Sequence, residues 1–98
     1  MKKLFCLITA LIVTIMGRSQ TAEEYNDKGD AKFILQDYAG AIECYNKATE
    51  LNPNLALAYG SRGFVKNILC DYTGAIKDIT KAIELNPNYK YNYEFYYR

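Results

Sequence analysis

The sequence predicts an all-α fold, an antiparallel helix-pair solenoid with about four helices and a short C-terminal helix. Two observations predict it: a repeat with a period of 34 residues, and helical spacing of the apolar residues inside each unit. The chain has 98 residues, half of them hydrophobic, and a formal charge of +1. Such a length holds one small domain, and such an apolar content excludes a disordered polar chain.

The repeat is visible when the sequence is aligned with itself at an offset of 34. Residues 22–55 and 56–89 share 18 identities in 34 positions. The segment 47–54, which contains a Leu-Asn-Pro-Asn run, returns at 81–88 with a single change. A period of this length is typical of a repeat architecture, in which each unit covers the apolar face of its neighbour. The domain is therefore expected to span residues 20–98, as two full units and a partial unit or capping helix at 90–98.

Within each unit the spacing predicts two helices. Apolar residues in 38–51 and 72–85 follow one another at intervals of three or four, which is typical of one helix face. Asp37 and Asp71 precede these helices and are expected to cap them. Asn-Pro pairs at 52–53 and 86–87 end these helices, because proline disfavours helical geometry in the residue before it. A break of two or three residues within each unit makes the paired helices antiparallel neighbours.

Two glycines fall inside the predicted second helices of the units. Gly40 and Gly74 are expected to destabilise these helices, because glycine in a helix interior costs about 1 kcal/mol relative to alanine. The sequence offers no reason for their presence in both units.

The first 19 residues predict a secretory signal rather than part of the fold. Lys2 and Lys3 precede an apolar run at 4–16, which is shorter than the roughly 20 residues that span a membrane. Gly17 and Ser19 supply small residues before a cleavage site. We expect residues 1–19 to be removed and the protein to be exported to the periplasm or secreted. The alternative is a membrane anchor formed by an uncleaved signal; after cleavage no membrane span is expected.

Composition argues against several functions. Removal of residues 1–19 leaves nine basic and eleven acidic residues, a balance that disfavours nucleic-acid binding. The chain has no histidine, so common zinc sites and histidine-dependent nucleophile systems cannot be built. No carboxylate pair, metal-ligand spacing or glycine-rich phosphate loop stands out. We therefore expect no enzyme activity, no metal and no cofactor.

The 34-residue unit resembles the tetratricopeptide repeat (TPR). The family pattern places an aromatic residue four positions before a small one, then alanines around an aromatic or aliphatic residue, then a proline. The matching residues here are Tyr25, Gly29, Ala41, Tyr45, Ala48 and Pro53, and in the second unit Tyr59, Gly63, Ala75, Ile79, Ala82 and Pro87. The family's usual leucine before the small residue is Lys28 and Arg62 in this chain, a departure expected to loosen the helix pair slightly.

The resemblance implies a right-handed superhelix whose first helices line a concave groove that binds a peptide or another protein. The groove residues carried over by spacing are Asn26, Asp30, Phe33, Leu57, Phe64, Asn67 and Tyr91. The alternative for each is an ordinary solvated helix face; Phe33 and Phe64 fit that alternative least. Members of the family that bind a C-terminal carboxylate use lysine and asparagine on these helices. Here the lysines are missing and Asp30 would repel a carboxylate, so carboxylate binding is not expected.

The C-terminal segment 90–98 is rich in tyrosine, which suits a protein interface. The leading expectation is an exported, non-catalytic interaction module with a protein or peptide partner. Two alternatives stay open: a structural unit that self-associates through this tail, and a truncated piece of a longer repeat protein.

Cys44 and Cys70 are expected to be partly shielded apolar residues rather than a disulfide, because their places in the unit set them too far apart.

Overall fold

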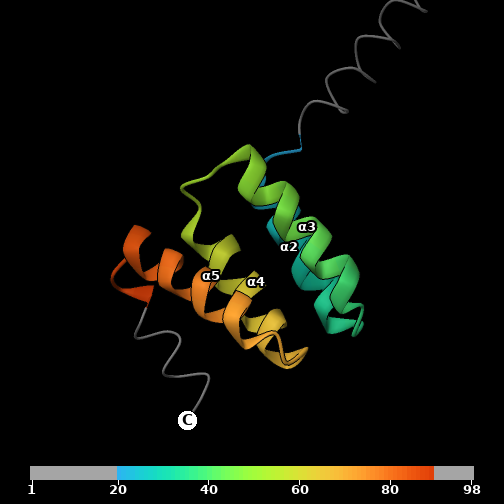
Figure 1. Cartoon of the computed structure of the whole chain (residues 1–98). Coiled ribbons are helices and arrows are strands. Elements are labelled where there is room, and N and C mark those ends of the chain that lie inside the picture. The colour runs from blue at the N-terminus through green and yellow to red at the C-terminus, as the bar shows by residue number, and fades with distance from the viewer. Residues whose placement is uncertain (1–19, 90–98) are drawn as a thin grey trace, which may run out of the picture.

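The computed structural model describes residues 20–89. Its helices in this range are α2 (Ala22–Ile34), α3 (Tyr38–Leu51), α4 (Ala56–Ile68) and α5 (Tyr72–Leu85). Figure 1 shows them as two antiparallel hairpins, α2–α3 and α4–α5, set side by side. No strand occurs within this part of the chain, so the all-α prediction is confirmed. The predicted signal segment 1–19 and the partial unit 90–98 lie outside the described residues.

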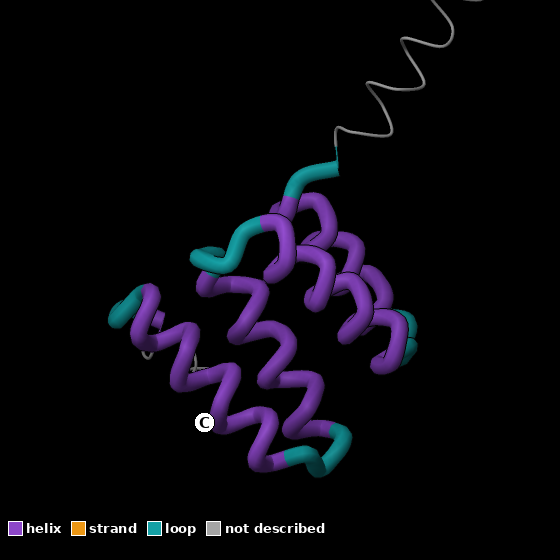
Figure 2. The backbone as a smooth tube through the Cα atoms, turned by 45° about the horizontal axis from the view of Figure 1, so that its top comes forward, coloured by secondary structure: helices purple, strands orange, loops and turns teal. Residues whose placement is uncertain are grey.

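Helix α4 joins the two hairpins. It packs along α5 within its own hairpin, against α3 of the first hairpin, and to a smaller extent against α2. The backbone tube in Figure 2 shows this succession of neighbouring helices connected by short turns. The first helices of the two units, α2 and α4, contact each other and together form one face of the molecule.

The predicted caps at the start of the second helices are confirmed. The side-chain oxygen Oδ1 of Asp37 accepts a hydrogen bond from the Gly40 N–H at 3.0 Å, and Asp71 accepts one from Gly74 at 3.1 Å. A Cβ atom on either glycine would collide with the capping carboxylate. The expectation that these glycines lie in the helix interior was wrong: each is the third residue of its helix, where it leaves room for the cap.

The turn between the helices of each unit uses a left-handed residue that is not glycine. Gln36 has φ of 62° and Cys70 has φ of 65°. The N–H of Gln36 donates to the carbonyl of Phe33 at 2.9 Å, and the N–H of Asp37 donates to that of Lys32 at 2.9 Å. This pair of bonds is a Schellman motif, which satisfies the last carbonyls of α2. The second unit repeats it at Cys70 and Asp71.

The second helices end where the Asn-Pro pairs predict. Helix α3 ends at Leu51 and α5 ends at Leu85, each followed by its asparagine. The Oδ1 atom of Asn52 then accepts from the N–H of Asn54 at 3.0 Å, and Asn86 makes the same turn in the second unit. Pro53 and Pro87 therefore mark equivalent corners of the two units.

Small residues allow the helices to approach closely. Ala41, Ala48 and Ala82 are fully buried, and a Cβ atom on Gly29 would lie 2.5 Å from Cε1 of Tyr45. The repeat positions divide by burial: Gly29, Ala41, Tyr45, Ala48, Gly63, Ala75 and Ala82 are buried, Tyr25, Tyr59 and Ile79 are half-buried, and Pro53 and Pro87 are exposed in turns. The core is thus built mainly from the residues that carry the repeat pattern.

Candidate functional site

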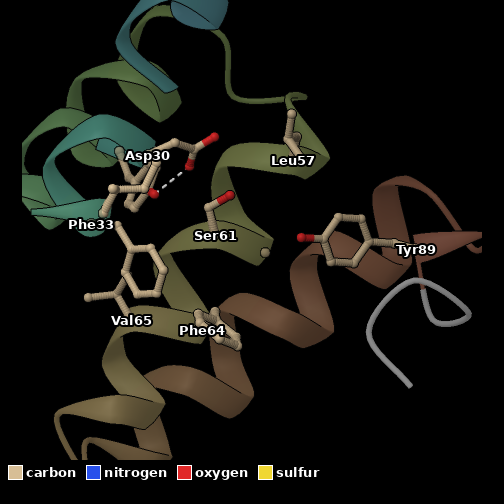
Figure 3. A pocket seen from close by; sticks show the side chains of 10 residues that line it. Asp30, Phe33, Leu57, Ser61, Phe64, Val65 and Tyr89 are labelled. Atoms are coloured by element: carbon tan, nitrogen blue, oxygen red, sulfur yellow. Dashed lines mark hydrogen bonds between the residues drawn. The ribbon is translucent and has the colours of Figure 1, made fainter. Parts of the chain in front are cut away.

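A pocket of about 300 Å³ lies on the face formed by α2 and α4. Figure 3 shows it from close by, with α2 on one side, α4 along its floor and Tyr89 opposite. Its lining is mostly apolar and aromatic, which is typical of binding pockets. The lining residues are Asp30, Phe33, Ile34, Tyr45, Leu57, Gly60, Ser61, Phe64, Val65 and Tyr89.

Two phenylalanines from different units meet at the pocket. The ring of Phe33 on α2 lies 5.5 Å from that of Phe64 on α4, edge to face at 72°. The ring of Phe33 also lies 5.8 Å from that of Tyr38. Both phenylalanines are half-buried, so they contact each other and still border the pocket. A fully solvated helix face suits phenylalanine poorly, and the structure places the two rings together in the pocket wall.

The polar end of the pocket is organised by a buried tyrosine. The hydroxyl of Tyr45, whose side chain is 1 % exposed, donates a hydrogen bond of 2.6 Å to Oδ1 of Asp30. Burial raises the pKa of Tyr45, and the hydrogen bond and negative charge of Asp30 raise it further, against a smaller opposing effect of Ser61. Tyr45 therefore remains protonated at neutral pH and holds the exposed carboxylate of Asp30 at the pocket.

Tyr89 forms the wall of the pocket that faces Asp30. Its hydroxyl end lies against Gly60, where a Cβ atom would overlap the phenol oxygen. In Figure 3 the Tyr89 hydroxyl and the Ser61 hydroxyl both point toward the interior of the pocket. A side chain at position 60 would therefore displace the Tyr89 phenol from this place in the pocket wall.

Four of the predicted groove residues line this pocket: Asp30, Phe33, Leu57 and Phe64. Asn67 instead borders a second pocket, over α5, with Tyr72 and Ile76. Tyr91 lies outside the described residues. The pocket thus contains part of the predicted set, and the groove itself stays a prediction.

The prediction that Asn26 lines the groove was wrong. Its side chain is 1 % exposed, and neither Oδ1 nor Nδ2 has a hydrogen-bond partner among the described residues. Spacing cannot reveal this burial, because it fixes the direction of a side chain on its own helix and not what the neighbouring elements cover.

Several other lining residues were missed for a similar reason, among them Tyr45, Ser61 and Tyr89. Tyr45 was predicted only as a structural repeat residue, and Ser61 and Tyr89 were not among the predicted groove residues. Each reaches the pocket through the packing of one element on another. The available sequence signal was the aromatic residue at the end of the second unit, where the first unit has Leu55.

Beside the pocket, α4 and α5 are joined by ion pairs. Arg62 binds Asp78 through two hydrogen bonds, Nε to Oδ2 at 2.8 Å and Nη2 to Oδ1 at 2.7 Å. Nζ of Lys66 lies 2.9 Å from Oδ2 of the same carboxylate. Arg62 also donates to Asn46 and Thr49 on α3, at 3.0 and 3.1 Å.

In the second unit this network runs against the expectation that the residue in place of the family's leucine loosens the helix pair. Arg62 connects α4 with both neighbouring helices, and a two-bond arginine–carboxylate contact is among the stronger polar contacts in proteins. Burial alone would raise the pKa of Asp78, but hydrogen bonds from Arg62 and Lys66 outweigh it and lower the pKa overall. The first unit lacks such a pair, because Cys44 occupies the place of Asp78.

Within residues 20–89 there is no cluster of acidic residues or cysteines suited to a metal ion. No helix in that range has the length and apolar character needed to cross a bilayer.

Cys44 and Cys70 are free thiols. Cys44 is half-buried as expected, but Cys70 is exposed, because it occupies the left-handed turn position.

The chain was also compared with known proteins. The family model described as "TPR repeat" matches residues 29–66, and the model described as "Tetratricopeptide repeat" matches residues 56–89. The second match coincides with the second unit of the sequence analysis. A search of curated proteins gave no significant match. Repeats of this kind generally serve as non-catalytic scaffolds for protein–protein interaction. With both matches lying on the paired helices described above, the chain belongs to the tetratricopeptide-repeat family.

Proposed function

We propose that this protein is an exported, non-catalytic module that binds a peptide segment of a partner protein on the face of α2 and α4. The observation that supports this most is the pocket between the units, with Phe33 and Phe64 in edge-to-face contact in its wall. Half-buried aromatic rings beside a pocket suit a protein interface, where aromatic residues are enriched and polar hydroxyls give orientation.

The size of the pocket favours a side chain of a partner over a large ligand. Its volume of about 300 Å³ is at the low end for ligand pockets. The lining comes from both units, so a bound segment would lie across α2 and α4. Leu57, which is 51 % exposed, provides further apolar surface at one end.

The groove is tested by selection from a random peptide library displayed on phage, with the purified full chain as target. We expect peptides whose binding falls at least about tenfold in the Phe33→Ala/Phe64→Ala variant, as expected for loss of central aromatic contacts. A matched control is Leu51→Ala/Leu69→Ala, which removes exposed leucines outside the pocket. Thermal unfolding verifies that each variant folds. The proposal would be contradicted if both double variants reduced peptide binding equally, or if the selection yielded no peptide.

Export is proposed from the N-terminal sequence alone. Lys2 and Lys3 followed by the apolar run at 4–16 support a secretory signal. Expression of the full chain in a bacterial host and N-terminal sequencing of the product should give Gln20 as the first residue. A product that starts at Met1 and sediments with membranes would support the anchored alternative instead.

A second candidate function is self-association, and one observation favours it. On α5, Tyr72 is 59 % exposed and Ile76 is 67 % exposed. Their equivalents Tyr38 and Ile42 on α3 are half-buried beside α4, and within the described residues α5 packs chiefly against α4. Sedimentation equilibrium of the full chain and of a variant lacking 90–98 tests this candidate. Association that is lost with the tail supports it, and a monomer at high micromolar concentration contradicts it.

A further inference from the structure

The pocket carries a single charge. Of its ten lining residues only Asp30 has a carboxylate side chain, and the others are apolar, glycine or hydroxyl-bearing. Asp30 is exposed and accepts the Tyr45 hydroxyl on Oδ1. An acidic group at the edge of an aromatic surface creates a site that favours positive charge.

The lysine and arginine side chains of α2 and α4 that have a described partner contact groups other than Asp30. Nζ of Lys32 lies 3.5 Å from Asp37, and Nζ of Lys28 lies 5.9 Å from the centre of the Tyr25 ring. Arg62 and Lys66 both bind Asp78. Within residues 20–89 no salt bridge reaches Asp30, so none of the cations described there compensates its negative charge.

We propose that the pocket receives a lysine or arginine side chain of the partner peptide, with the charged end at the Asp30 carboxylate. This proposal rests on the function proposed above and specifies the chemistry of the segment bound. Charge complementarity selects this occupant: an acidic side chain would meet repulsion from Asp30, and an uncharged one would give the carboxylate no partner of opposite charge beside the Tyr45 hydroxyl.

The other lining groups suit both parts of a basic side chain. Lysine and arginine bury their aliphatic stems against apolar surface while the charged end stays near polar groups. Phe33, Phe64 and Leu57 provide the apolar surface, and aromatic faces also attract cations. The Ser61 hydroxyl supplies an additional acceptor beside Asp30 (Figure 3). A hydrogen bond between charged groups is roughly twice as strong as a neutral one, which makes Asp30 the main determinant.

The test uses four capped amino acids as probes: the N-acetyl methylamides of arginine, lysine, norleucine and glutamate. Each is titrated into the ¹⁵N-labelled full chain and followed by two-dimensional NMR. We expect arginine and lysine to shift the amide signals of Asp30, Ser61 and Phe64 and to bind about tenfold more tightly than norleucine, the apolar analogue of lysine. The glutamate probe should bind most weakly.

Charge-removing variants assign the effect to Asp30. Asp30→Asn keeps an oxygen that can accept from Tyr45 and should reduce the affinity for arginine and lysine to that for norleucine. The matched control Asp27→Asn removes a charge from an exposed residue of α2 that does not line the pocket, and should leave the affinities unchanged. Thermal unfolding of both variants verifies that the fold persists.

The outcomes separate this proposal from the function on which it rests. Equal affinity for arginine and norleucine, affinity unchanged in Asp30→Asn, or no binding of the basic probes would each overturn the basic side-chain proposal. Peptides from the phage selection that depend on Phe33 and Phe64 but lack basic residues would still support the groove. Absence of any selected peptide would instead contradict the proposed function itself.

Discussion

Arg62 of α4 and Asp78 of α5 form a two-bond contact, with both N···O distances below 3.0 Å. The Asp78 side chain is 6 % exposed and that of Arg62 is 15 % exposed, so little water reaches the pair. Removal of one partner from such a pair leaves a buried charge without compensation. The contact is therefore expected to be important for the stability of the second hairpin.

The variant Asp78→Asn should be less stable by about 3 kcal/mol, because Arg62 and Lys66 lose the carboxylate that neutralises them. Urea denaturation of the full chain followed by circular dichroism measures the change. Asp27→Asn, on an exposed site of α2, is the control and should change the free energy of unfolding by less than about 0.5 kcal/mol. Equal stability of the two variants would show that the pair contributes nothing.

The same carboxylate predicts a dependence of stability on pH. The pKa of Asp78 is lower in the folded protein than its ordinary value, so its ionised form favours folding. That contribution is complete above about pH 5 and is lost as the pH falls below about 4, through the folded-state pKa. The stability difference between the natural chain and Asp78→Asn should shrink over this range. A difference that stays constant between pH 6 and pH 2.5 would contradict the assignment.

The variant Asn26→Leu should increase stability by about 1–2 kcal/mol. Leucine has the same branched shape, and it replaces two buried polar atoms that lack partners with methyl groups. The midpoint of thermal unfolding should rise accordingly. The control is Asn67→Leu on α4, at a half-buried asparagine, and it should give no comparable gain. Loss of stability in Asn26→Leu would mean that the amide makes a favourable contact that the described residues do not reveal.

The left-handed turns offer a second stabilising change. In Gln36→Gly a residue with φ of 62° becomes one that adopts this conformation without steric cost, which should add about 1 kcal/mol to the stability. Cys70→Gly should act in the same way in the second unit. Gln36→Ala keeps the unfavourable conformation and should bring no gain in the unfolding midpoint. If glycine and alanine have the same effect at position 36, the turn stores no strain.

Local features of the sequence predict the helix bounds well. Asp37, Asp71 and the Asn-Pro corners act through contacts with residues only a few positions away, and the structure confirms each of them. Gly40 and Gly74 also act through a short-range contact, because each lies beside the capping carboxylate three residues earlier. Their role depends on where the helix begins, which the structure shows.

The candidate site depends on contacts between elements, and the sequence predicts these less well. Asn26 and Gly60 occupy the same position in the two units, yet Asn26 is buried without partners and Gly60 forms the pocket floor beneath Tyr89. Cys44 and Asp78 are likewise equivalent, and only Asp78 binds an arginine. Equivalent positions share a backbone conformation but meet different neighbours.

The sequence by itself determined the repeat, the antiparallel helix pairs, their caps and the face on which a groove would lie. These follow from a 34-residue period and from short-range backbone chemistry, which every unit contains within itself. Only the tertiary structure decided which residues of that face are accessible, and it brought Asp30, Tyr45, Ser61 and Tyr89 to one pocket. The physical reason is that side-chain burial is set by the packing of whole helices, where distant residues compete for the same space.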